Sequence, residues 1–184
     1  MSRGGGGVRI TGGAWRGRRI RVPATARPTT ERAREAIWSR WQRRVEGANC
    51  LELYAGSGVM SLEALSRGAA RCTAVDQSGA AVRQLRRHSE ELNAELNVMV
   101  ATLPTQWPRV ARCLAGPVDL VFLDPPYKDT ISDGLLRQLA DVLAPDGRIA
   151  VEHAAREELT LPENLVCEDS RRYGETAVTF LRQP

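Results

Sequence analysis

A glycine-rich turn followed by a distant carboxylate is the feature of the sequence with the clearest chemical meaning. Residues 52–58 read Glu-Leu-Tyr-Ala-Gly-Ser-Gly, and Asp76 lies 20 residues after Gly56. Glycines at the end of a parallel strand let the backbone approach a ligand closely, and an acid ending the next strand can accept hydrogen bonds from ribose hydroxyls. This spacing indicates a site for a cofactor that contains a nucleoside.

The residues around the turn separate two classes of cofactor. A dinucleotide-binding G-x-G-x-x-G motif would place Gly or Ala at position 61, where this chain has Ser61, and it gives no role to an acid before the first glycine. Glu52 fits instead the S-adenosylmethionine (SAM) pattern acid-x-x-x-Gly-x-Gly, in which the acid orients the methionine end of the cofactor. A structural glycine turn in an unrelated α/β domain is the alternative.

A second motif, Asp124-Pro125-Pro126-Tyr127, directly follows the apolar run 118–123. Such a run is typical of a strand buried on both faces, and residues after its carboxyl end face the ligand crevice. A carboxylate and a rigid carbonyl can hold an exocyclic amine, aim its lone pair at a methyl group and stabilise the developing positive charge. Two prolines restrict the loop, and the tyrosine offers a flat face to a base. We expect these four residues to be catalytic; a proline-rich turn is the alternative.

The alternation of short strands with helices predicts the architecture that would position these motifs. It indicates an α/β fold with a doubly wound, mostly parallel sheet and a closing C-terminal antiparallel pair. We expect strands over residues 50–54, 72–75, 97–101, 118–123, 148–152, 165–168 and 176–181, and helices over 60–67, 80–92 and 132–143.

The N-terminal part of the chain differs from this alternation. Residues 8–22 predict a small hairpin around Gly12-Gly13. An apolar residue at every fourth position then predicts a helix over 31–45, with Arg on its remaining faces and with Trp38 and Trp41 packed on the body.

Positive charge is concentrated in the same N-terminal part. Residues 1–44 contain twelve Arg and two Glu, a net charge of +10, whereas residues 45–184 have a net charge of −6. This asymmetry predicts a basic arm that meets a polyanion.

Composition excludes several other classes. The four cysteines form no C-x-x-C pair, which argues against a zinc site and suits buried, reduced thiols of a cytoplasmic protein. No stretch approaches ~18 apolar residues, so we expect no membrane span. The 184 residues fit one domain with a short appendage.

The order of the motifs resembles the RsmD family of 16S ribosomal RNA (guanine-N2)-methyltransferases across nearly the whole chain. Besides the two motifs above, four segments carry the resemblance: RITGGAWRGR (9–18), RPTTERARE (27–35), LEALSRGA (62–69) and RYGET (172–176). The resemblance implies a Rossmann-like class I methyltransferase fold that transfers a methyl group from SAM to the exocyclic N2 amine of a guanine in 16S ribosomal RNA. We expect a monomer that needs no metal and acts on 16S ribosomal RNA within an assembling or assembled small ribosomal subunit.

The resemblance also implies roles for individual residues. Cofactor contacts are expected from Arg27, Pro28, Thr29, Glu52, Tyr54, Ala55, Gly56, Ser57, Gly58, Asp76, Gln77, Thr102 and Leu103. RNA contacts are expected from Arg9, Trp15, Arg16, Arg18, Arg19 and Arg21. Residues 1–26 would form the RNA-binding hairpin and tail, and residues 27–184 the methyltransferase domain.

The chain departs from the family pattern at two places. Val59-Met60-Ser61 replaces small residues after the turn, and Ala101-Thr102-Leu103 stands where an acid often meets the adenine amine. Two alternatives to the guanine activity remain open. One is an amino-methyltransferase for adenine N6, a DNA base or a glutamine amide, although the basic arm favours nucleic acid. The other is a non-catalytic RNA-binding assembly factor.

Overall fold

The structure is a computed structural model that describes residues 7–22, 31–126 and 131–184. Its N-terminal elements are the strands β1 (Gly7–Arg9) and β2 (Arg19–Arg21) and the helix α1 (Glu31–Trp41). The elements that follow are β3 (Asn49–Leu53), α2 (Val59–Ser66), β4 (Arg71–Asp76), α3 (Gly79–Leu92), β5 (Leu96–Val100), α4 (Trp107–Arg112), β6 (Val118–Leu123), α5 (Asp133–Ala140), β7 (Leu143–Ala154), β8 (Val166–Tyr173) and β9 (Thr176–Arg182).

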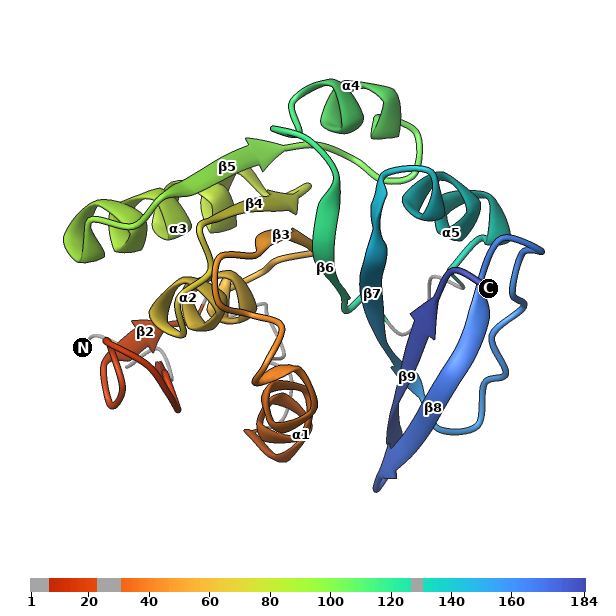
Figure 1. Cartoon of the computed structure of the whole chain (residues 1–184). Coiled ribbons are helices and arrows are strands. Elements are labelled where there is room, and N and C mark those ends of the chain that lie inside the picture. The colour runs from red at the N-terminus through yellow and green to blue at the C-terminus, as the bar shows by residue number, and fades with distance from the viewer. Residues whose placement is uncertain (1–6, 23–30, 127–130) are drawn as a thin grey trace.

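Seven of these strands form one mixed sheet in the order β5-β4-β3-β6-β7-β9-β8 (Figure 1). Strands β3 to β7 pair in parallel, and β9 pairs antiparallel with both β7 and β8. The chain moves outward from β3 to β5 and then returns to the other side of β3 as β6. This order confirms the predicted doubly wound sheet with a closing antiparallel pair.

Several elements differ from the prediction. The helix predicted over 31–45 ends at Trp41, and the strand predicted over 165–168 extends to Tyr173 because it pairs with β9 along its length. Strand β7 begins at Leu143, five residues earlier than predicted, because a register shift between Val118 and Leu120 of β6 accommodates residues 145–147 inside the strand. The helix predicted over 132–143 therefore ends at Ala140. Helix α4 was not predicted, since six residues are too few for a periodic pattern.

Helices cover both faces of the sheet. One face packs Leu53, Val121, Leu123 and Val151 against α4 and α5, while alternate residues such as Phe122 pack against α1 and α2. A strand that is buried on both faces has a nearly continuous run of apolar residues. For this reason the bounds predicted for β6, 118–123, are those of the structure.

Two tryptophans attach α1 to the sheet, as predicted. The rings of Trp38 and Trp41 lie 5.1 and 5.0 Å from that of Phe122, in tilted arrangements, and both tryptophans are almost fully buried. The stripe of Ala33, Ile37 and Trp41 that predicted this helix is buried with them.

The predicted thiol burial is half right. Cys50 and Cys72 are buried, whereas Cys113 and Cys167 are exposed. Cys113 lies at the end of the unpredicted α4, and Cys167 lies on the edge strand β8.

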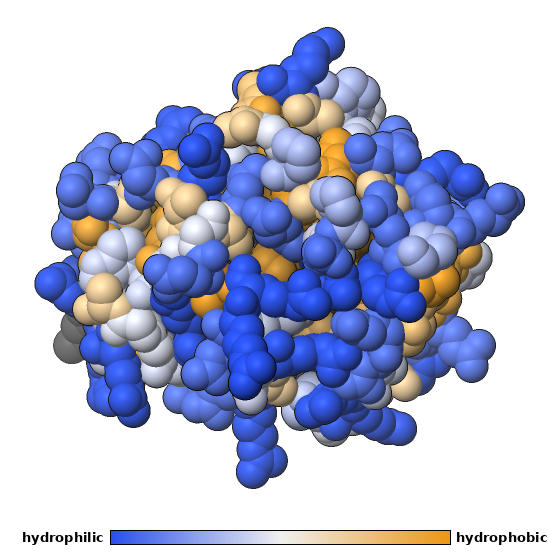
Figure 2. Space-filling model, in the orientation of Figure 1, coloured by the Kyte–Doolittle hydropathy of each residue, from blue (hydrophilic) through white to orange (hydrophobic). Residues whose placement is uncertain are grey.

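The face of the molecule drawn in Figure 2 is largely hydrophilic. Among the described residues, Val100 alone is a large hydrophobic residue that is exposed. Among the helices that the structure describes, none has the length and apolar character to cross a bilayer.

The hairpin β1–β2 packs against the body through α2 (Figure 1). Ile10 and Ile20 are buried in a cluster that includes Leu62 of α2. The backbone N–H groups of Ala14 and Trp15 donate to the carbonyl and hydroxyl oxygens of Ser66, at 2.7 and 2.9 Å. A side chain at Gly13 would overlap the Ser66 carbonyl, so the glycine permits this close approach.

A buried ion pair joins the hairpin, α1 and α2. Arg34 Nη1 lies 2.9 Å from Glu63 Oε1, and it also donates to the backbone carbonyl of Arg9 at 3.1 Å. The Thr11 N–H donates to the same Glu63 oxygen at 2.6 Å. Arg34 lies outside the apolar stripe of α1, as the helix pattern predicted, yet it is buried and holds three segments together.

Replacing Arg34 with Ala should lower the free energy of unfolding by about 3–5 kcal/mol, because it leaves the Glu63 carboxylate buried without its main counter-charge. Urea denaturation monitored by tryptophan fluorescence measures this loss. Arg32, exposed on the same helix, provides the matched control, and its replacement with Ala should change stability by less than about 0.5 kcal/mol. Equal losses in the two variants would contradict the role given to the ion pair.

Candidate functional site

The predicted motifs meet where the strand order of the sheet reverses. Leu53 of β3 is the register partner of Val75 on β4 and of Leu123 on β6. The residues that follow them, Tyr54, Asp76 and Asp124, therefore lie side by side at the carboxyl edge of three neighbouring strands. Open α/β sheets bind their ligands in the crevice at this position.

The glycine-rich turn has a backbone that few residues can adopt. Tyr54, Gly56 and Gly58 have φ values of 60°, 52° and 68°, in the left-handed region. A side chain at Gly58 would also overlap Leu85 of α3, so this glycine serves helix packing as well as the turn. Tyr54 holds a conformation that is unfavourable for its type, and strain of this kind is concentrated in ligand-binding loops.

Asp76 fixes the turn and still has acceptor capacity for a ligand. Its Oδ2 accepts from the Gly56 N–H and its Oδ1 from the Ser78 N–H, both at 2.7 Å. Each carboxylate oxygen can accept two hydrogen bonds, so one site on each oxygen remains for a hydroxyl. Among the described residues no cation pairs with this half-buried carboxylate, which suits a neutral partner such as ribose. The geometry fits the nucleoside part of SAM.

Val100 adds a surface that the sequence analysis missed. It is the register partner of Asp76 at the end of β5, and 39% of it is exposed. An apolar side chain beside a ribose acceptor suits the flat adenine of SAM. The sequence analysis missed Val100 because a valine at the end of a strand has the same sequence signature whether its side chain is buried or exposed.

Glu52 anchors the first turn of α2. Its Oε2 accepts hydrogen bonds from the backbone N–H of Ser61, at 2.8 Å, and from the Ser61 hydroxyl. Burial raises the pKa of Glu52 to about 7, although the hydrogen bonds from Ser61 oppose this shift and the nearby charge of Asp124 adds to it. Ser61, a departure from the family pattern, thus becomes the partner of the motif acid.

The remaining predicted cofactor residues lie in three different settings. Ala55 and Ser57 are buried in the turn, and Gln77 is exposed just after Asp76. Thr102 is exposed, and its N–H donates to Gln106 Oε1 at 2.7 Å, while Leu103 packs against the core on the α4 side. Thr102 therefore offers its hydroxyl rather than its backbone N–H.

Several predicted residues cannot be placed. Arg27, Pro28, Thr29 and Tyr127 lie outside the described residues. Pro125 is half-buried and Pro126 is exposed, directly after the half-buried Asp124.

The predicted RNA contacts lie on the hairpin. Trp15 is half-buried there and packs against the cluster around Ile10, so only part of its ring is available. The exposed arginines are Arg9, Arg16, Arg18, Arg19 and Arg21.

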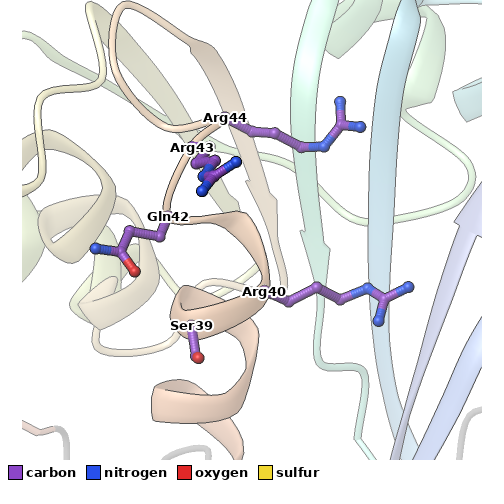
Figure 3. Close-up of a pocket in the computed structure, with 5 residues that line it drawn as sticks. All are labelled: Ser39, Arg40, Gln42, Arg43 and Arg44. Carbon is purple, nitrogen blue, oxygen red and sulfur yellow. The ribbon is translucent and has the colours of Figure 1, made fainter.

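A pocket of about 490 Å³ lies at the C-terminal end of α1. It is lined by Ser39, Arg40, Gln42, Arg43 and Arg44. In Figure 3 the side chains of Arg40 and Arg44 extend in one direction, and Gln42 points the opposite way. Arg40 pairs with Asp169 at 2.9 Å, near the start of β8, which separates this pocket from the motifs. In the described part of the chain, no group of His, Cys, Asp and Glu side chains could hold a metal ion.

Comparisons with known proteins agree with this arrangement. Residues 8–182 match the family described as Conserved hypothetical protein 95. The chain is 36% identical to Ribosomal RNA small subunit methyltransferase D of Escherichia coli over 159 residues, which cover 81% of this chain and 73% of that protein. It is 30% identical to the protein of the same name in Haemophilus influenzae, over 86% of this chain and 85% of that one.

A solved structure supports the same relationship. The Escherichia coli protein yhhF superposes with a TM-score of 0.81 at 31% identity, covering 97% of this chain and 98% of its own.

Replacing Asp76 with Ala should weaken binding of SAM and of its demethylated product alike, by about 1–3 kcal/mol, because the ribose hydroxyls lose their acceptor. The variant also releases the Gly56 N–H that organises the turn. Titration calorimetry with both ligands measures the change, and Glu90→Ala, at an exposed position on α3, is the control. Unaltered dissociation constants would show that the ribose is held elsewhere.

Proposed function

This chain belongs to the Conserved hypothetical protein 95 family, and from that membership we propose that it transfers a methyl group from SAM to the exocyclic N2 amine of a guanine in 16S ribosomal RNA. Two relatives carry the name Ribosomal RNA small subunit methyltransferase D. The observation that carries the proposal is the meeting of the Tyr54–Gly58 turn, Asp76 and Asp124 at one edge of the sheet. One described chain supplies all three, so the proposed site needs no second copy.

The residues around the turn hold and orient the cofactor. Asp76 accepts from the ribose hydroxyls, and Val100 covers the adenine. Glu52, held by Ser61, faces the methionine end. Bound SAM supplies a methyl group on a sulfonium, whose C–S bond breaks as the new C–N bond forms.

Asp124 and Pro125 act on the amine that receives the methyl group. The lone pair of an exocyclic amine is delocalised into the base, so the amine is a weak nucleophile. The Asp124 carboxylate and the Pro125 carbonyl accept its two N–H bonds and direct the lone pair at the methyl carbon. The carboxylate stabilises the positive charge that develops on nitrogen and then accepts one of its two protons, which it passes to solvent.

The hairpin supplies the RNA contacts. Residues 7–22 carry five arginines and no acidic residue, whereas residues 45–184 have a net charge of −6. Phosphate groups are therefore attracted to the hairpin. Its bonds to Ser66 hold it on α2, the helix that follows the glycine-rich turn, so a bound phosphate has a defined position relative to the cofactor.

A direct test of the function uses labelled SAM and small subunits that lack the modification. We expect label on the N2 amine of one guanine of 16S ribosomal RNA, in the assembling or assembled subunit of the cytoplasm. Label on another base or on protein would contradict the proposal.

Replacing Asp124 with Ala should lower the turnover number by about 10²–10³, because a charge-assisted hydrogen bond is lost in the transition state. Its effect on SAM affinity should be small, since this carboxylate holds the amine. Single-turnover kinetics and calorimetry measure the two quantities, with Asp133→Ala, exposed at the start of α5, as the control. Unchanged turnover would remove Asp124 from the mechanism.

Reversing the charges of Arg16 and Arg18 should weaken RNA binding and reduce its salt dependence by about one counterion for each phosphate that the variant no longer binds. Point variants are the right tool, because deletion of the hairpin would expose the side chains that it buries against α2. Fluorescence anisotropy over a range of salt concentrations measures both effects. Arg112→Glu and Arg137→Glu, exposed on the opposite side of the sheet, are the matched control. An equal loss in both pairs would mean that charge alone, not the hairpin, determines binding.

A further inference from the structure

Glu152 on β7 lies beside Asp124 in the sheet. Leu123 of β6 is the register partner of Val151, so the next residues of the two strands, Asp124 and Glu152, are neighbours. Adjacent strands are about 4.8 Å apart, which places the two carboxyl groups within reach of a single base.

The two side chains also share a face of the sheet. Phe122 and Ala150, two positions before them, belong to the cluster beneath α1, and Val178, the register partner of Glu152, belongs to the same cluster. Side chains alternate along a strand, so both acids face α1. Glu152 is 7% exposed, and its backbone pairs with β9 on the side away from β6, which fixes its position.

The proposed reaction brings a particular hydrogen-bonding edge to this place. In guanine the ring N1–H lies next to the N2 amine and is a donor. Adenine and cytosine have an unprotonated ring nitrogen, an acceptor, next to the exocyclic amine. A carboxylate accepts hydrogen bonds only. It therefore pairs with the N1–H of guanine and repels the unprotonated ring nitrogen of adenine or cytosine.

We propose that Glu152 is a specificity-determining residue, whose carboxylate accepts the N1–H of the target guanine while Asp124 and Pro125 hold its amine. The inference rests on the proposed function and extends it to the choice of base. With the wrong base, the buried Glu152 carboxylate would face a ring nitrogen that is also an acceptor, and no hydrogen bond could form. The free-energy cost of that missing hydrogen bond discriminates against the wrong base.

The test compares guanine with 2-aminopurine at the target position of one RNA substrate. 2-Aminopurine keeps the amine but has no N1–H. For the wild-type protein we expect kcat/KM to favour guanine by at least tenfold. Glu152→Gln presents an amide that can donate to the bare N1, so the guanine preference should fall by about 10–100-fold. Glu163→Gln, the same substitution at an exposed position, should leave the preference unchanged.

Several results would overturn the inference. An unchanged preference in Glu152→Gln would do so, as would equal losses on both substrates, which would indicate a purely structural side chain. Equal rates of the wild-type protein on the two bases would also overturn it, whether or not the variant folds. Failure of the proposed function is distinct, since the wild-type protein would then place no methyl group on the N2 amine of the target guanine.

Discussion

Backbone pairing of β3 with its two parallel neighbours is the constraint on which the site depends. Each pairing register brings the carboxyl end of a strand to the same level, so Tyr54, Asp76 and Asp124 lie together at one edge of the sheet. A slip of one residue in either pair would turn the acid toward the opposite face of the sheet. The hydrophobic residues that set the register therefore determine the geometry of the chemistry.

A second group of contacts connects the surface to this edge. Glu63 and Ser66 lie on α2, the helix that begins after Gly58, and both bind the loop between β1 and β2. The glycine-rich turn and the basic hairpin thus occupy opposite ends of one short helix. The ion pair with Arg34 adds α1 to this unit, so the basic hairpin and the glycine-rich turn share a rigid support.

Local patterns predicted the fold better than they predicted its contacts. The apolar run 118–123 and the glycine-rich turn could be interpreted because each carries its own physical signature. The helix pattern placed Arg34 outside the apolar stripe and did not predict its burial, because its partner Glu63 is 29 residues away and no local pattern reveals it. Residues 145–147 (Pro-Asp-Gly) are types that favour turns, and the predicted strand began after them, but tertiary pairing placed them inside β7. From the sequence, Ser61 was only a departure from the family pattern. In the structure its hydroxyl donates a hydrogen bond to the Glu52 carboxylate.

The attachment of the hairpin to α2 has a consequence for synthesis of the chain. Trp15 and Ser66 are separated by 51 residues, so the N-terminal arginines leave the ribosome well before the helix that receives them. Until α2 has been synthesised, Ile10 and Ile20 lack the Leu62 side chain against which they pack in the folded protein. An attachment over this sequence distance also raises the contact order of the fold, and high contact order goes with slow folding. The hairpin can dock only after the chain has been synthesised through α2, although it stands first in the sequence.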